Sequence, residues 1–382
     1  MKSSLILFLF CFYSTFSIAQ TKPLASDNLF HTKADSITDK FVKEFFFNSH
    51  SVGLSIGIYF DGQFCTYNYG ETNKITHNLP TANTLYNLAS ITKTITGVLL
   101  AQAQIEGKLN IDDDIRKHLK GSFPNLEYDG HPIKIYQLLN HTSGLPFFLP
   151  NKPNAFNDTT ISPNLISAQL LKNYSRQNFY EDLRKVKLDT IPGLKEQYSN
   201  AAGQLAGYIL ENIYSKTYES LVKMYLKKLA KMNDTKITIT PSDKTRFASG
   251  YDKFGNETSP GPDQFQAAGS LKSTVNDMLK YIKWQLNEKN KVVQLTHKPT
   301  TSISKGGFSV GLNWSMYKTT KDIRVIWQNG NVPGASSWCI LYPELKMGII
   351  LFTNQTDQTS SHRLAVLGES IMISLNSNAP EF

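Results

Sequence analysis

Alternating apolar and polar residues predict β-strands near the start of the chain. Two such runs, residues 52–60 and 63–69, are separated by Asp61 and Gly62. An Asp-Gly pair between alternating runs is typical of a two-residue β-hairpin, because both residues tolerate the positive φ angles that this turn requires. We therefore expect the first two strands to be neighbours in an antiparallel sheet.

The hydrophobic pattern then changes to helical spacing. In residues 90–106 the apolar side chains Ile95, Val98 and Leu99 recur three and four positions apart, which places them on one face of a helix. Similar spacing predicts further helices at residues 135–139, 167–174, 201–214, 219–232 and 274–286. Residues 147–164 are polar and rich in Asn and Pro, so we expect an exposed loop there.

Strand-like runs return towards the C-terminus. They occupy residues 309–317, 323–328, 336–342 and 347–353. A last helix is expected near residues 362–375. Strands at both ends of the chain with helices between them predict a mixed α/β fold of the α+β class.

The order of these elements also predicts how the chain is divided. An antiparallel sheet built from both chain ends would be covered by the first and last helices, and the middle would form an inserted, mostly helical subdomain. We expect one domain over residues 20–382. Its α/β part would comprise about residues 28–88 and 265–382, and its helical part about residues 89–264.

The first 19 residues have the pattern of a secretory signal peptide. Lys2 supplies a positive charge, and residues 5–16 form an apolar run too short to span a bilayer comfortably. Ser17 and Ala19 supply small residues at the cleavage positions. We therefore expect cleavage before Gln20 and export to the periplasm or the outside of a bacterial cell, with no transmembrane segment afterwards.

The charge distribution argues against nucleic-acid binding. The 382 residues include 40 Lys and Arg and 31 acidic residues, a net charge of +9, without a long basic block. A hydrophobic fraction of 40% is ample for a large core. After removal of the signal peptide only Cys65 and Cys339 remain, so the sequence allows either one disulfide or two lone thiols.

Ser90 and Lys93 are the first candidates for catalytic chemistry. They stand three residues apart at the start of the predicted helix of residues 90–106, and residues three apart lie on one helical face. An acylating serine needs a nearby base and N–H donors for the oxyanion, and this position offers both. Taken alone, the same pattern also fits a capping serine beside a surface lysine.

A second candidate is the polar sequence Tyr198-Ser199-Asn200. On an extended segment, the side chains of Tyr198 and Asn200 face the same way. The tyrosine could relay a proton, and Asn200 could hold Lys93 or a substrate amide through hydrogen bonds. The alternative is an ordinary helix start, in which Ser199 or Asn200 caps the helix of residues 201–214 and Tyr198 packs.

A third candidate is the sequence Gln-Asn-Gly at residues 328–330, for which two turns compete. Asn-Gly is the commonest two-residue hairpin turn, and it would place this pair at an exposed tip. A turn at Pro333 and Gly334 would instead leave residues 328–331 on a strand beside the cleft between the two parts of the fold. In that register the N–H of Asn331 could donate to an oxyanion.

Together these segments resemble the serine β-lactamase-related family, which includes class C β-lactamases, low-molecular-weight penicillin-binding proteins, D-amino-acid peptidases and esterases. Residues 85–93, Leu-Tyr-Asn-Leu-Ala-Ser-Ile-Thr-Lys, are similar to the nucleophile motif of the family. Tyr198-Ser-Asn200 is similar to its second catalytic motif. Residues 138–145, Leu-Leu-Asn-His-Thr-Ser-Gly-Leu, are similar to a widespread family segment that we interpret as structural.

The resemblance implies an exported serine hydrolase of the β-lactamase/transpeptidase fold without a metal or organic cofactor. Ser90 would attack a carbonyl carbon, Tyr198 with Lys93 would take its proton, and the N–H groups of Ser90 and Asn331 would hold the oxyanion. The implied substrate-binding residues are Asn200, Gln328, Gly330 and Asn331. The implied partner is a small-molecule or peptidoglycan-derived substrate.

Position 328 departs from the family pattern. Residues 328–334 align with a third motif that usually begins with Lys or His, and this alignment favours the register in which they lie on the strand. A cation would pair with the carboxylate of a β-lactam or of a D-alanine terminus, whereas Gln328 can make only a neutral hydrogen bond, about half as strong. The substrate could therefore be a β-lactam, a D-amino-acid peptide or an ester, and an esterase-like member would turn β-lactams over poorly.

A protein that binds penicillins without hydrolysing them, as a sensor or scaffold, is the alternative from another functional class. The intact set of Ser90, Lys93 and Tyr198 argues against it.

Two other serine motifs lack the structural context that they require. Ser302 and Lys305 repeat the Ser-x-x-Lys spacing, but in a Gly-flanked loop with no helix behind it. Residues 307–311, Gly-Phe-Ser-Val-Gly, match the nucleophile motif of α/β-hydrolases, but strand-like residues follow Ser309 where that motif needs a helix. The eight histidines show no metal-binding spacing.

Overall fold

The computed structural model describes residues 23–49, 51–156, 166, 169–258, 261, 263–303 and 307–376. Residues 1–19, for which we predict a signal peptide, lie outside this part of the chain. Among the helices that are described, none combines the length and the apolar character needed to cross a membrane.

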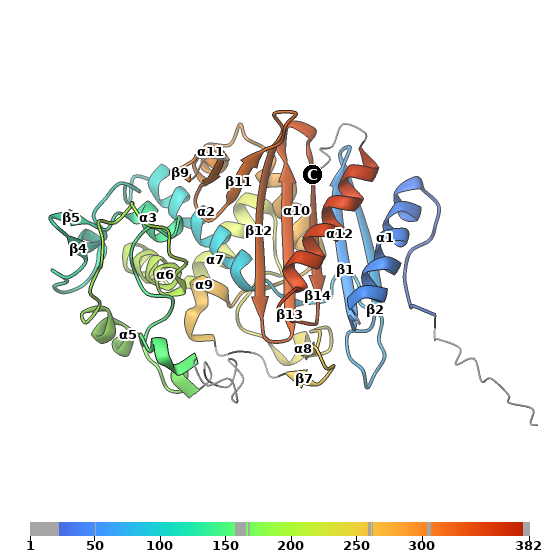
Figure 1. Ribbon diagram of the computed structural model, residues 1–382, viewed down its shortest axis with the longest axis horizontal. Coiled ribbons are helices and arrows are strands. Elements are labelled where there is room, and N and C mark those ends of the chain that lie inside the picture. Colours follow the sequence, from blue (N-terminus) through green and yellow to red (C-terminus); the bar gives the residue numbers. More distant parts are fainter. Residues whose placement is uncertain are drawn as a thin grey trace, which may run out of the picture.

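An antiparallel sheet forms the centre of the described structure, with eight strands in the order β2-β1-β14-β13-β12-β11-β10-β9 (Figure 1). The strands are β1 (Gly53–Phe60), β2 (Gln63–Gly70), β9 (Thr301–Ile303), β10 (Phe308–Val310), β11 (Ser315–Lys318), β12 (Arg324–Val332), β13 (Ala335–Tyr342) and β14 (Met347–Thr353). β1 pairs with β14, from Leu54 opposite Thr353 to Tyr59 opposite Gly348. The expected sheet built from both chain ends is thus confirmed.

The first hairpin forms where the Asp-Gly pair predicts it, whereas one predicted strand is split. Asp61 and Gly62 have φ angles of 49° and 78°, both positive as a type I′ turn requires. Residues 309–317 form β10 and β11 with a bend between them instead of one strand. The bend brings Gly311 so close to α11 (Lys291–His297) that a Cβ atom there would overlap the carbonyl oxygen of Thr296.

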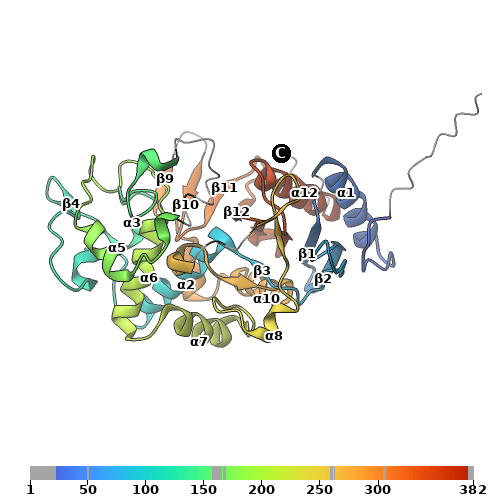
Figure 2. The ribbon, with the colours of Figure 1, turned by 90° about the horizontal axis from the view of Figure 1, so that it is seen from below.

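Helices cover both faces of the sheet (Figures 1 and 2). α12 (Ser360–Leu375) and α1 (Lys33–Ser49) lie on one face, and α10 (Val275–Gln285) lies on the other. The sequence pattern did not predict α1. Its buried apolar residues are only Val42 and Phe45, so the helical period of hydrophobic residues is weak.

The middle of the chain forms a mostly helical part beside the sheet (Figure 2). At its centre is α2 (Thr92–Ile105), in which residues 92–103 are all buried. α2 packs against α6 (Asn200–Tyr214), α9 (Gln266–Gly269) and α11. A helix buried on every side holds its residues rigidly, which matters because its first turn carries a candidate site residue.

The remaining described elements are short or peripheral. They are the helices α3 (Ile135–Leu139), α5 (Arg176–Leu183), α7 (Tyr218–Ala230) and α8 (Pro241–Lys244), and the strand pairs β3 (Tyr86–Asn87) with β8 (Lys272–Ser273), β4 (Glu127–Tyr128) with β5 (His131–Pro132), and β6 (Gly250–Tyr251) with β7 (Glu257–Thr258). The helices predicted at residues 201–214, 219–232 and 274–286 are confirmed to within two residues at each end. The helix predicted at residues 167–174 lies partly outside the described residues.

Cys65 and Cys339 are both free thiols, which decides between the two possibilities that the sequence left open. Cys339 is fully buried in β13, and this burial raises the pKa of its thiol.

Candidate active site

Ser90 lies in a single 3-10 turn, Ala89–Ile91, immediately before α2. Ala89 has a φ of 48°, a left-handed conformation that residues other than glycine rarely adopt. β12 approaches this turn so closely that a Cβ atom on Gly330 would overlap the carbonyl oxygen of Leu88. Ser90 is therefore held between the start of a buried helix and a strand of the main sheet.

The amine of Lys93 is fully buried, one turn into α2. Its Nζ lies 3.1 Å from Ser90 Oγ and 2.6 Å from the Tyr198 hydroxyl. It also donates to Asn200 Oδ1 at 2.8 Å and to the carbonyl oxygen of Ala268 at 2.7 Å. The sequence also allowed a capping serine beside a surface lysine. The enclosure of the Lys93 amine by these oxygens rules out that alternative.

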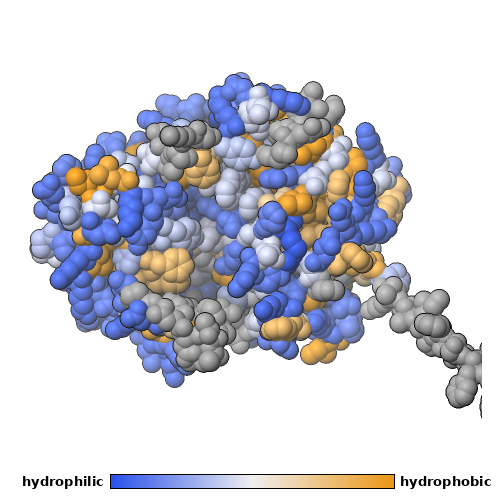
Figure 3. Space-filling model, viewed as in Figure 1, coloured by the Kyte–Doolittle hydropathy of each residue, from blue (hydrophilic) through white to orange (hydrophobic). Residues whose placement is uncertain are grey.

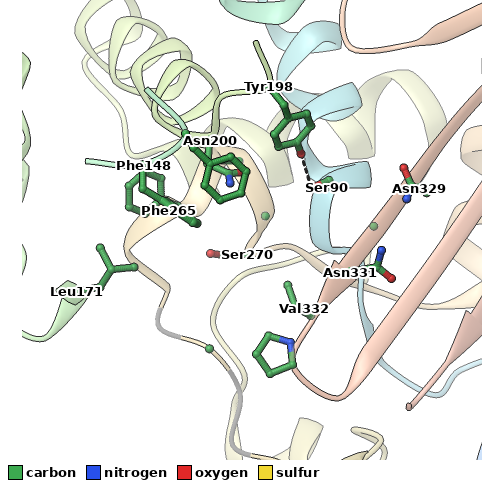
Figure 4. Close-up of a pocket in the computed structure, with 16 residues that line it drawn as sticks. Ser90, Phe148, Leu171, Tyr198, Asn200, Phe265, Ser270, Asn329, Asn331 and Val332 are labelled. Atoms are coloured by element: carbon green, nitrogen blue, oxygen red, sulfur yellow. Dashed lines mark hydrogen bonds between the residues drawn. The ribbon is translucent and has the colours of Figure 1, made fainter. Parts of the chain in front are cut away.

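The hydroxyl of Tyr198 contacts both the serine and the lysine, and Figure 4 shows it pointing at Ser90. It is 2.6 Å from Ser90 Oγ. Lys93 Nζ lies 4.8 Å from the centre of the tyrosine ring, close enough for a cation–π contact. The tyrosine is 37% exposed, so the group of three side chains reaches the surface through it.

A loop around His141 positions Tyr198 and the residues beside it. The N–H of Gln197 donates to the carbonyl oxygen of His141 at 2.6 Å, and the N–H of Asn200 donates to that of Phe147 at 2.9 Å. The His141 ring packs 4.3 Å from the Tyr198 ring, centre to centre. The sequence predicts a structural role for this segment, and these contacts show that it positions the candidate tyrosine.

The ring of His141 is neutral in the folded protein near neutral pH. Burial, helped by the nearby Lys93 amine, lowers the pKa of His141 to about 3. Its Nδ1 faces the N–H of Ser199 at 3.4 Å, and only an unprotonated nitrogen can accept from that group. His141 therefore supports the tyrosine segment without adding a charge to the site.

Ser199 and Asn200 serve two different purposes at the start of α6. Ser199 Oγ accepts from the N–H of Ala202 at 2.9 Å and donates to the carbonyl oxygen of Pro146 at 2.7 Å. It is the helix cap, while the next residue binds Lys93. The helix-start and functional interpretations of this motif are thus compatible.

The turn after β12 falls at Pro333 and Gly334, so the third motif lies on the strand. Gly334 has a φ of 74°, as the residue after proline in a type II turn requires. Gly330 pairs with Ser337 on β13, which rules out a hairpin tip at this glycine.

Gln328 does not take the place that the sequence analysis expected, facing the cleft. The side chain is buried, with Nε2 donating to the carbonyl oxygen of Asn313 at 2.8 Å and Oε1 accepting from the N–H of Asn329 at 2.9 Å. The bend between β10 and β11 offers this carbonyl oxygen, and it draws the amide away from the pocket. The side-chain amides of Asn329 and Asn331 both donate to Ser361 Oγ on α12, at 2.8 and 2.5 Å.

A pocket of about 440 Å³ opens above Ser90, between the helical part and β12. Ser90, Tyr198 and Asn200 line it, together with residues 329–333. Figure 3 shows a hollow on this face of the molecule, and Figure 4 shows the lining side chains around it. Candidate residues from the helical part and from the sheet thus line one cavity.

The sequence model of the family described as Beta-lactamase matches residues 38–367. The chain belongs to the β-lactamase family. The matched segment includes every candidate site residue from Ser90 to Asn331.

Curated relatives of this β-lactamase-family chain differ in length. It is 27% identical over 332 residues to Protein flp of Staphylococcus aureus strain N315, an alignment that covers 83% of this chain and 62% of that protein. The chain therefore spans less than two thirds of that relative. It is 23% identical over 389 residues to the D-alanyl-D-alanine-carboxypeptidase/endopeptidase AmpH of Escherichia coli K12, covering 97% of this chain and 96% of that protein.

Solved structures show the same fold. The β-lactamase/D-alanine carboxypeptidase from Pseudomonas syringae has a TM-score of 0.76 at 18% identity and covers 92% of this chain and 100% of its own. A class C β-lactamase from Rhodobacter sphaeroides has a TM-score of 0.74 at 17% identity, covering 89% of this chain and 99% of its own. The fold predicted from the sequence is confirmed.

The two discounted serine motifs lie apart from this pocket. Ser309 is on β10 opposite Met316, in a strand and not at a strand-to-helix turn. Ser302 is on β9, and Lys305 lies outside the described residues. No group of three or more potential metal ligands occurs among the described residues.

Sequence reasoning missed two contributors to the site. The carbonyl oxygen of Ala268 binds Lys93, but a backbone group has no signature in the sequence. The aromatic wall of the pocket comes from separate segments, at Phe147, Phe148 and Phe265. The adjacent residues Phe147 and Phe148 are the available signal, but they stand at the start of a segment whose Asn and Pro residues predict a polar loop.

Proposed function

We propose that this β-lactamase-family protein is an exported serine hydrolase that works through an acyl-serine intermediate. One observation carries the proposal: the functional groups of Ser90, Lys93 and Tyr198 all lie within hydrogen-bond distance of one another. The Tyr198 hydroxyl is 2.6 Å from both Ser90 Oγ and Lys93 Nζ, and these two atoms are 3.1 Å apart. A nucleophile in contact with its base, and a base oriented by further groups, is the arrangement that serine catalysis requires.

The partners of Lys93 determine how the serine proton can move. Asn200 Oδ1 and the carbonyl oxygen of Ala268 can only accept, so they occupy two N–H groups of the amine. The remaining position on Nζ faces Ser90 and Tyr198. If Lys93 is an ammonium, it stabilises a deprotonated Tyr198, whose oxygen accepts the proton of Ser90. If Lys93 is a neutral amine, its lone pair accepts the proton, directly or through the Tyr198 hydroxyl.

The reaction then has two halves. Ser90 Oγ bonds to the carbonyl carbon and its proton passes to the Tyr198–Lys93 pair, while the N–H groups of Ser90 and Asn331 hold the oxyanion. The bond to the leaving group breaks, and the leaving group takes that proton. Water next attacks the acyl-serine ester and gives a proton to the same pair, which returns it to Ser90 Oγ as the acid leaves.

Four residues were expected to bind the substrate, and their positions support two kinds of role. Asn200, Gly330 and Asn331 line the pocket, so we propose that they contact the substrate directly. We propose that Gln328 acts indirectly, by positioning Asn313. Its side-chain amide donates to the carbonyl oxygen of Asn313, and Asn313 Nδ2 in turn donates to the carbonyl oxygen of Lys93 at 3.1 Å.

Export and the substrate range belong to the same proposal. The signal-peptide pattern of residues 1–19 supports export to the periplasm or the cell exterior. The name of the Escherichia coli relative, a D-alanyl-D-alanine-carboxypeptidase/endopeptidase, supports peptidoglycan-derived D-peptides as candidates, beside β-lactams and esters.

Intact-protein mass spectrometry after treatment with a fluorophosphonate, and separately with a penicillin, tests the proposal. We expect the fluorophosphonate to add once, at Ser90, and the adduct to disappear in Ser90→Ala. Ser309→Ala is the matched control and should label like the wild type. Labelling that maps to another serine, or that survives Ser90→Ala, would contradict the assignment.

A further inference from the structure

Resting on the proposed function, we infer that the preferred substrate is an uncharged ester whose acyl group is aromatic and binds against an aromatic wall in the pocket that Ser90 lines. This narrows the range of β-lactam, D-peptide and ester to one chemical class.

The wall consists of rings that fix one another. Phe148 packs edge to face against Phe147, with ring centres 4.6 Å apart, and against Phe265, with centres 5.1 Å apart. Phe179, which is buried, lies behind Phe265 with centres 6.2 Å apart. Edge-to-face packing of this kind leaves a rigid apolar surface that a further ring can contact.

The wall and the nucleophile line the same pocket, with Tyr198 between them. Phe147 contacts Tyr198, with ring centres 5.9 Å apart. Figure 4 shows Phe148, Phe265 and Leu171 across the pocket from the β12 residues, with the pocket between them. An acyl group stays bonded to Ser90 through both halves of the reaction, whereas the alcohol leaves after the first. A wall in the same pocket as Ser90 can therefore contact the acyl group in both halves of the reaction.

The surface of the pocket offers no charge to a substrate carboxylate, because the amine of Lys93 is fully buried behind Ser90 and Tyr198. None of the described residues that line the pocket is Lys, Arg, His, Asp or Glu. Two cations are close in sequence to residues at the pocket, and both are already paired. Lys272, near Ser270, binds Asp263 at 2.8 Å, and Arg363, near Ser361, binds Asp357 at 2.5 Å. A carboxylate placed here would lose water without gaining an ionic partner, which disfavours carboxylate-bearing β-lactams and D-alanine peptides.

The side-chain amides on β12 each donate a hydrogen bond within the protein. The amides of Asn329 and Asn331 donate to Ser361, and the amide of Gln328 is held by Asn313. A site without an anchor for a charged group depends on apolar contact to position the carbonyl. It also suits an ester, because an ester carbonyl is attacked more readily than the resonance-stabilised carbonyl of an unstrained amide.

Three p-nitrophenyl esters with the same leaving group test the inference on the full-length mature protein: the phenylacetate, the 4-carboxyphenylacetate and the acetate. We expect kcat/KM for the phenylacetate to exceed the values for the other two by at least about tenfold, the range that apolar pocket contacts provide. Phe148→Ala should lower the phenylacetate-to-acetate ratio by about tenfold, and Phe148→Leu should lower it less.

Phe47→Ala is the matched control, since Phe47 lies on α1 and is 84% exposed, and its ratio should equal that of the wild type. Phe148→Leu keeps an apolar side chain and serves if the alanine variant does not fold. Equal turnover of the neutral and carboxylated esters would overturn the inference, and so would an unchanged phenylacetate-to-acetate ratio in both Phe148 variants. The proposed function would still stand in either case if fluorophosphonate labels Ser90. Absence of both labelling and ester turnover overturns the two together.

Discussion

At the scale of single residues, the candidate site is organised around one buried amine. An amine without partners in the protein interior is costly, and Lys93 is tolerated because oxygens of Ser90, Tyr198, Asn200 and Ala268 surround it. Those same contacts align the serine and the tyrosine. Stability and chemistry thus depend on one set of hydrogen bonds.

We expect Lys93 and Tyr198 to act as one unit. Lys93→Met and Tyr198→Phe should each lower kcat/KM for an ester by about 10²–10⁴-fold, the usual contribution of a general base. The double variant should be at most about tenfold worse than the poorer single variant, because the second change removes a group that has already lost its function. Losses that multiply fully would mean that the two residues serve separate steps.

His141 should make folding stability depend on pH. Its pKa is lowered to about 3 in the folded protein, mainly by burial, whereas the unfolded chain binds a proton near pH 6.5. The contribution is therefore fully present above about pH 6.5 and is lost as the pH falls from there towards 3. Between pH 7.5 and 5 the loss from this group should be roughly 2 kcal/mol.

Urea unfolding at the two pH values measures this loss. His141→Gln should show a change between pH 7.5 and 5 that is smaller by that amount, since glutamine does not titrate. An equal pH dependence in both proteins would show that His141 becomes protonated without cost.

At the scale of elements, the geometry around Ser90 depends on how close β12 comes to the start of α2. Gly330 allows this approach, and Ser337 Oγ on β13 donates to the carbonyl oxygen of Leu88 at 2.8 Å across the same contact. The N–H donors proposed for the oxyanion belong to these two elements. Their separation therefore sets the distance between the donors.

Gly330→Ala should slow acylation while leaving the fold in place. A methyl group here would overlap the carbonyl oxygen of Leu88 and the Cβ of Ala89, so β12 must move away from Ser90. We expect the rate of fluorophosphonate labelling to fall at least about tenfold, since small displacements of catalytic groups are costly. Gly330→Ser should be slower still. Labelling at the wild-type rate in both variants would remove β12 from the oxyanion site.

At the scale of the whole molecule, the sheet joins the two ends of the chain. β1 near the N-terminus lies between β2 and the C-terminal strand β14, and the pocket lies where this sheet meets the helical part. Neither part contains the complete site, because Ser90 and Tyr198 come from one and residues 329–333 from the other. We therefore expect the two parts to unfold in one transition, in which the active site is lost as well.

Ile56→Ala tests this cooperativity. Ile56 is fully buried in β1, opposite Leu351 of β14, and its truncation should cost about 2–5 kcal/mol of unfolding free energy. Loss of circular dichroism and loss of Ser90 labelling should share one urea midpoint, shifted down by the same amount. Ile75→Ala, at a side chain that is 82% exposed, is the matched control and should be neutral. Two separate midpoints would mean that the two parts unfold independently.

The sequence by itself determined the features that depend on neighbouring residues. Asp61 and Gly62 specify their turn through their own φ angles, and the spacing of Ser90 and Lys93 puts them on one helical face wherever the helix lies. The general fold followed from the order of strand-like and helix-like runs, because each periodicity reflects a face that must be buried.

Only the tertiary structure decided the features that depend on partners distant in the chain. Pairing of β12 with β13 placed the turn at Pro333 instead of at the Asn-Gly pair, although both sequences suit a turn. A carbonyl oxygen in the bend at Asn313 drew Gln328 away from the cleft, and that of Ala268 completed the shell around Lys93. Hydrogen bonds to backbone oxygens and ring packing between separate segments leave no local pattern, so the sequence could not specify them.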